Sequence, residues 1–152
     1  MLSTRLVQLI ESNWEEISDR VVRAVKRHPD LTHLAGRPDL ELREWCREIL
    51  QNFGYLLSAT KDEDVQRQFE ALGAMRFEED IPLHETVLRV HILKDKLIGF
   101  VHEQGFAMSA MQLYAEEELE QRMDRLFDAL VYRIVRGYES AQLFERRLSS
   151  GL

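Results

Sequence analysis

Residues 109–150 read SAMQLYAEEELEQRMDRLFDALVYRIVRGYESAQLFERRLSS. Almost 40 residues pass here without a proline or, apart from Gly137, a glycine, and Ser109 with Gln112 has the S-x-x-Q form of a helix-starting capping box. Apolar or small residues recur at intervals of three and four, interrupted near Arg133: Leu119, Met123, Leu126, Leu130, Gly137, Ala141, Phe144 and Leu148. The stretch therefore predicts one continuous helix of about 55–60 Å at 1.5 Å per residue.

A helix of this length exceeds the bundle on which it packs, so its second half must bury an apolar stripe elsewhere. We expect this half to pair with a second copy of the chain or to dock on a partner protein. The candidate dimer or output surface consists of Leu130, Ile134, Ala141, Phe144 and Leu148. The alternative is that the stripe packs on other helices of the same chain, and the sequence leaves both readings open.

The preceding residues predict four further helices. The expected ranges are 2–28, 39–59, 60–77 and 82–104. Residues 29–38 carry two prolines and a glycine and should form a loop or a short turn, Thr60 opens a T-x-x-E capping box, and Gly105 is a typical stop for the fourth helix. The predicted fold is an all-α bundle of about five main helices, forming a single domain over residues 1–152.

Composition and charge narrow the functional classes. With 45% hydrophobic residues, the 152-residue chain can bury a core without disulfides, and its one cysteine, Cys46, is expected to be a small buried hydrophobe. A net charge of −7 argues against nucleic acid as a partner, because binding to phosphates depends on Lys and Arg. No stretch predicts a membrane span or a signal peptide, so a cytoplasmic protein is expected.

The sequence lacks the patterns that predict an enzyme. We find no nucleophile paired with a base, no carboxylate pair in apolar surroundings and no glycine-rich phosphate loop. The carboxylate-rich runs at 62–64 and 116–118 fall in the first turns of predicted helices, where negative charge favours the helix dipole. A non-catalytic protein is therefore predicted.

The helix over 82–104 carries the densest set of chemically capable residues. His84, His91, Asp95 and His102 fall within about 20° of one line along it, at the edge of the apolar face. The opposite, polar face is expected to hold Glu85, Arg89, Lys96 and Glu103. Only His91 and Asp95 are spaced to share an ion, and two ligands are too few, so no metal and no cofactor are predicted.

Two alternatives remain open for this helix. In a histidine phosphotransfer protein, His91 would accept the phosphoryl group and Lys94 would steady its charge, although Asp95 stands where that motif favours a glycine. In a haem-binding globin-like sensor, His84 or His91 would be the axial ligand, although the charges around Lys94 do not suit a haem pocket.

Several short motifs occur in a characteristic order along the chain. They are Arg76-Phe77, Ile81-Pro82-Leu83-His84-Glu85, Arg89-Val90-His91-Ile92-Leu93-Lys94, the segment 127–132, and Arg136-Gly137-Tyr138-Glu139. With these motifs the sequence resembles the N-terminal domain family of RsbT co-antagonist proteins of the RsbRD type, from the second predicted helix to about residue 140.

The resemblance implies an all-helical sensory or regulatory input module, of the kind found ahead of STAS domains, histidine kinases or other output domains in bacterial signalling proteins. Related modules have a globin-like fold without haem. We therefore expect a homodimer or a complex with a signalling partner, and a small-molecule ligand is possible. The candidate sensing site is Arg76, His84, His91 and Asp95, where titratable groups meet the edge of the core.

Overall fold

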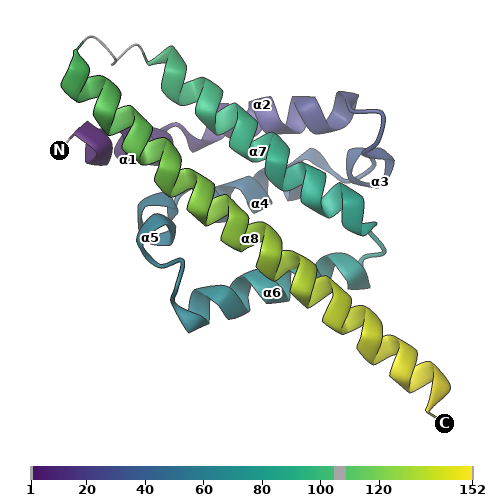
Figure 1. Ribbon diagram of the computed structural model, residues 1–152. Helices are drawn as coiled ribbons and strands as arrows, with labels where there is room; N and C mark the ends of the chain where they lie inside the picture. Colours follow the sequence, from purple (N-terminus) through teal and green to yellow (C-terminus); the bar gives the residue numbers. More distant parts are fainter. Residues whose placement is uncertain (1, 105–108, 152) are drawn as a thin grey trace.

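A computed structural model describes residues 2–104 and 109–151, and over these ranges the chain forms eight α-helices and no strand (Figure 1). The helices are α1 Leu2–Ser12, α2 Trp14–Arg27, α3 Thr32–Ala35, α4 Asp39–Leu50, α5 Phe53–Ser58, α6 Glu63–Glu78, α7 Leu83–Glu103 and α8 Ala110–Ser150. The predicted all-α class and long C-terminal helix are confirmed. The predicted stop at Gly105 lies outside the described residues.

Two of the predicted helices are each broken by an asparagine. Helix 2–28 divides into α1 and α2 at Asn13, and helix 39–59 divides into α4 and α5 next to Asn52. In both places the side-chain amide donates to the carbonyl four residues earlier, from Asn13 to Leu9 at 2.7 Å and from Asn52 to Glu48 at 3.1 Å. Asparagine competes in this way with the backbone ladder, which explains why each of these two predicted helices is divided into two shorter ones.

The helix ends follow capping chemistry. The Ser109 hydroxyl accepts from the Gln112 N–H, as predicted, whereas α6 is capped by Asp62 and not by Thr60. The Asp62 carboxylate accepts two backbone N–H groups of the first turn, and its charge also favours the helix dipole. At the other end of α6, Asp80 takes a left-handed conformation with φ of 59°, and the Ile81 N–H bonds back to the Arg76 carbonyl.

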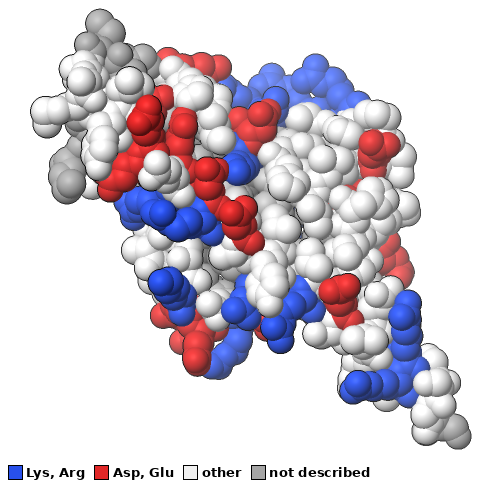
Figure 2. Space-filling view, viewed as in Figure 1, with Lys and Arg blue, Asp and Glu red and all other residues white. Residues whose placement is uncertain are grey.

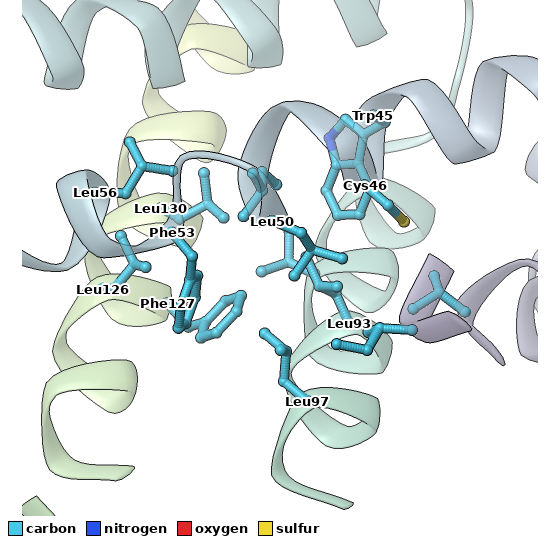
Figure 3. Packing of buried hydrophobic residues seen from close by; sticks show 14 of the residues in the cluster. Trp45, Cys46, Leu50, Phe53, Leu56, Leu93, Leu97, Leu126, Phe127 and Leu130 are labelled. Carbon is cyan, nitrogen blue, oxygen red and sulfur yellow. The ribbon is translucent and has the colours of Figure 1, made fainter. Parts of the chain in front are cut away.

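The core lies where α8 crosses the other helices. Figure 1 shows α8 running diagonally over the bundle, with α7 beside its first half and α6 crossing its second half. Side chains from four helices meet underneath (Figure 3), among them Leu50, Phe53, Leu93, Leu97, Leu126 and Phe127. Cys46 is also buried, as predicted. Leu130 and Ile134 belong to this core with 1% exposure each, so their assignment to an exposed dimer or output surface is corrected.

The contact between α6 and α8 is made backbone to backbone through two glycines. A Cβ placed on Gly73 would lie 1.9 Å from the Ile134 carbonyl oxygen, and one on Gly137 would lie 1.8 Å from the Glu70 carbonyl oxygen. No side chain fits at either position. The glycine in the middle of the long helix is therefore explained by the close approach of α6.

The end of α8 projects beyond the other helices (Figure 1), and Tyr138 is the last buried residue of α8. The Tyr138 hydroxyl donates to the Ile81 carbonyl at 2.8 Å, and its ring packs edge-on against Phe77. From Leu143 to Ser150 every residue of α8 is exposed, and we call this segment, residues 143–150, the overhang. Among the described residues, no helix combines the length and apolar character needed to cross a membrane.

Candidate functional site

The structure does not bring the four predicted sensing residues together. Arg76 lines a cavity of about 240 Å³ between α4 and α6, whereas Asp95 lines a separate cavity of about 530 Å³ between α2 and α7. His84 and His91 are exposed on α7 and line neither cavity. Of the predicted set, only Asp95 faces the larger cavity, together with His102 from the same stripe.

The larger cavity follows from the amphipathic pattern of α2. Its apolar residues at 17, 21 and 25 are buried in the core, which places Arg20, Arg23 and Arg27 along the edge that faces α7. Figure 2 shows Lys and Arg atoms gathered over α2 at the upper edge of the molecule. The α7 side of the cavity is lined by Asp95, Lys96, Ile98, Gly99, His102 and Glu103.

Positive charge dominates the lining of this cavity. The charge of Arg20 is compensated by two ion pairs, with Glu103 at 2.7 Å and Glu16 at 2.8 Å. The hydrogen bond to Glu103 is the main cause that raises the pKa of Arg20. Within the described ranges, no carboxylate forms an ion pair with Arg23 or Arg27. In a chain of net charge −7, this is a local excess of arginine that suits a carboxylate or phosphate.

Glu85 was expected on the polar face of α7, but it is buried with 1% exposure. Its carboxylate accepts the backbone N–H groups of His33 at 3.1 Å and Leu34 at 3.0 Å, and it lies 2.6 Å from the His33 Nδ1 atom. These N–H groups belong to the first turn of α3, where a helix has free donors. Glu85 therefore holds α3 against α7.

Arg89 was also expected on the polar face and is also buried, with 3% exposure. Its guanidinium lies 4.0 Å from the centre of the Trp45 ring, and its Nη1 atom has no hydrogen-bond partner in the described structure. Burial lowers the pKa of Arg89 to about 9 and raises the pKa of the nearby Cys46 thiol to about 11. Within the described residues, the guanidinium is contacted by an aromatic face and forms no ion pair with a carboxylate, although the charges of Glu79 and Glu48 favour its protonated form.

Comparison with known protein families assigns the chain to a family. Residues 15–148 match the family described as RsbT co-antagonist protein rsbRD N-terminal domain. The chain belongs to this family. The match begins in α2 and ends in the overhang, so the rsbRD N-terminal domain includes both cavities and the glycine crossing, and it extends further than the sequence motifs had indicated. Membership implies an input domain in stress signalling.

No curated protein and no solved structure matches the chain. The family match therefore rests on sequence alone, and the residues of the site are inferred from the arrangement of side chains in the structure.

The geometry does not favour the two alternative readings of the histidine stripe in this rsbRD N-terminal domain. Lys94 forms an ion pair with Asp124 of α8 at 2.7 Å, so its charge is engaged across α7 and α8 and is not reserved for His91. His84 and His91 face the exterior, whereas an axial haem ligand faces a mainly apolar interior.

The sequence did not predict the role of the α2 arginines in the cavity between α2 and α7, because helical periodicity does not show which helices are neighbours.

Proposed function

We propose that this chain is a cytoplasmic, non-catalytic input module of a bacterial stress-signalling pathway, which acts by binding and passes its signal on through α8. The observation that carries the proposal is the continuity of α8. One helix of 41 residues begins beside α7, crosses the core and ends in the exposed overhang. A helix of this kind can transmit a shift or rotation if a ligand or partner binds its two arrangements unequally.

The output surface in this proposal is the overhang. Leu143, Phe144 and Leu148 are 51%, 64% and 56% exposed, and their spacing places them on neighbouring turns of α8. Exposed apolar side chains at this spacing are typical of a helix that pairs with another helix. We assign the overhang to a homodimer contact with a second copy, next to the half-buried Ala141. The family description, RsbT co-antagonist, supports RsbT and its associated proteins as the proposed downstream partners.

The ligand in this proposal is a small anion bound in the cavity between α2 and α7. Arg23 and Arg27 supply guanidinium groups that form no ion pair with a carboxylate of the described residues, and Lys96, which pairs with Asp95, adds a third cation from the opposite wall. Planar guanidinium groups recognise carboxylate and phosphate through paired hydrogen bonds. The cavity volume of about 530 Å³ is in the range of small-molecule sites.

The dimer is tested by light scattering in line with gel filtration on the untagged chain. We expect a dimer at tens of micromolar, and we expect the double variant Phe144→Glu, Leu148→Glu to be monomeric with unchanged helix content. The matched control is Leu40→Glu, which changes an apolar side chain of 77% exposure outside α8 and should remain dimeric. A monomeric wild type, or a double variant that stays dimeric, would contradict the assignment of the overhang.

The anion site is tested with inorganic phosphate and citrate as probes in calorimetric titrations. We expect the double variant Arg23→Gln, Arg27→Gln to lose at least about tenfold in affinity, which corresponds to about 1.4 kcal/mol. Arg67→Gln is the control, because Arg67 is an exposed arginine of α6 remote from this cavity. Equal affinity in the two variants would show that binding is unspecific.

A further inference from the structure

Three metal-ligating side chains converge between the end of α7 and the beginning of α8. His102 lies in the last turn of α7, and Glu116 and Glu120 lie four residues apart within the first three turns of α8. One ligand atom from each of the three lies within 4.8 Å of the others. The His102 Nε2 atom is 2.5 Å from a Glu120 oxygen and 3.5 Å from a Glu116 oxygen.

The charges of this cluster are not balanced by lysine or arginine. Within the described residues, neither Glu116 nor Glu120 forms an ion pair with either residue type, and both face the single imidazole of His102. Glu116 is only 8% exposed, and its carboxylate accepts no hydrogen bond from any residue of the described ranges. Two carboxylates that share one imidazole repel each other, and a bound cation would compensate their charge.

We propose that His102, Glu116 and Glu120 bind a divalent transition-metal ion of the Zn²⁺ class. Zn²⁺ accepts imidazole nitrogen and carboxylate oxygen at about 2.0–2.2 Å, and ligand atoms in a tetrahedral site are about 3.4 Å apart. The 2.5 and 3.5 Å separations reach that geometry through side-chain adjustments of about 1 Å. Three protein ligands leave the fourth position for water or an exogenous ligand.

The donor set narrows the choice of ion. One imidazole and two carboxylates suit zinc and similar first-row ions, whereas calcium and magnesium prefer an all-oxygen shell. The sequence did not predict this site, because periodicity relates potential ligands within one helix, such as His91 and Asp95, and not ligands on two different helices. The two glutamates come from a different helix, and their spacing of four residues is also an ordinary surface pattern.

A bound ion would fasten the end of α7 to the beginning of α8. The same imidazole lines the cavity between α2 and α7, so the ion would also fix one wall of that cavity. The site does not depend on the proposed signalling function, since it requires only the three side chains.

The experiment is a titration of the full, untagged chain, stripped with EDTA, with ZnCl₂, MnCl₂ and CaCl₂. We expect one Zn²⁺ per chain and weaker binding of Ca²⁺. A Zn²⁺ concentration about 100-fold above the dissociation constant should raise the melting temperature by about 5–10 °C. His102→Gln and Glu120→Gln should each lower the Zn²⁺ affinity at least about tenfold.

The matched control is His91→Gln, which removes an exposed histidine from the same helix and should leave Zn²⁺ binding unchanged. The helix content of each variant is measured by circular dichroism before titration. Absence of stoichiometric Zn²⁺ binding to the folded wild type overturns the proposal. So does an affinity that falls in His91→Gln but not in His102→Gln or Glu120→Gln.

Discussion

Replacing Gly137 with alanine should force α6 away from α8 and destabilise the protein by about 2 kcal/mol. The new Cβ would lie 1.8 Å from the Glu70 carbonyl oxygen, about 1.6 Å short of ordinary contact at 3.4 Å. The obstacle is helix backbone, which has no rotamer to change, so the cost falls at or above the upper end of the 1–3 kcal/mol typical of overpacking. Alanine gains about 1 kcal/mol over glycine in helix propensity, which leaves the net loss.

Gly99 provides the control inside the same protein. It also lies in the interior of a long helix, but a Cβ added there would have no atom within 4 Å. Gly99→Ala should therefore stabilise the protein by about 0.5–1 kcal/mol through propensity alone. Both variants are measured by urea unfolding followed by circular dichroism at 222 nm. If Gly137→Ala is as stable as the wild type, or shifts in the same direction as Gly99→Ala, the backbone contact between α6 and α8 is refuted.

Three further predictions concern buried or strained groups. Burial lowers the pKa of Arg89 to about 9 in the folded protein, so above pH 9 the folded state binds fewer protons than the unfolded chain and the free energy of unfolding rises with pH. Burial raises the pKa of Cys46 to about 11, so over pH 9–11 the folded state binds more protons and the free energy of unfolding falls with pH. The free energy of unfolding is measured by urea titration at several pH values between 9 and 11. Its slope against pH should become more negative in Arg89→Met and more positive in Cys46→Ala, each by up to about 1.4 kcal/mol per pH unit. Unchanged slopes would contradict the burial of this pair. Asp80→Gly should raise the melting temperature by about 2–4 °C, because glycine adopts the φ of 59° without strain, and a lower melting temperature would speak against that conformation. Glu85→Ala should cost about 2–4 kcal/mol in urea unfolding by leaving two N–H groups of α3 unpaired, whereas the exposed Glu118→Ala should change stability by less than about 0.5 kcal/mol; equal effects would contradict the buried contact.

The positions of the helices could be predicted largely because their signals are local. The long run without proline predicted α8, and the hydroxyl of Ser109 predicted its first residue. The breaks at Asn13 and Asn52 were missed, because asparagine lowers helix propensity only slightly and its competition with the backbone is decided by packing. Gly137 appeared in the sequence as one member of an apolar stripe, and only the approach of α6 gives it a reason.

The sites were less predictable because they depend on which helices are neighbours. The histidine stripe of α7 was expected at the edge of the apolar face, whereas its four residues are exposed, and Asp95 and His102 face arginines of α2, which lie about 70 residues earlier in the chain. Glu85 and Arg89, four residues apart, look like an exposed ion pair on a helix face. They are buried because α3 supplies backbone donors to one and Trp45 supplies an aromatic face to the other.

In the proposed function, the contacts of α8 constrain the movements by which a signal would reach the overhang. At Gly137 the helix rests on the backbone of α6 with no side chain between them, so no rotamer change can absorb a displacement of α6. Close by, the Tyr138 hydroxyl is bonded to the carbonyl of Ile81, in the turn that joins α6 to α7. A movement of α7, whether it begins at the arginine-lined cavity or elsewhere, therefore acts on that turn and on the crossing together. Because the overhang is a continuation of the same rigid helix, the motion available to it is a tilt or rotation of α8 about this crossing, and a ligand produces it only by binding one of the two orientations more tightly.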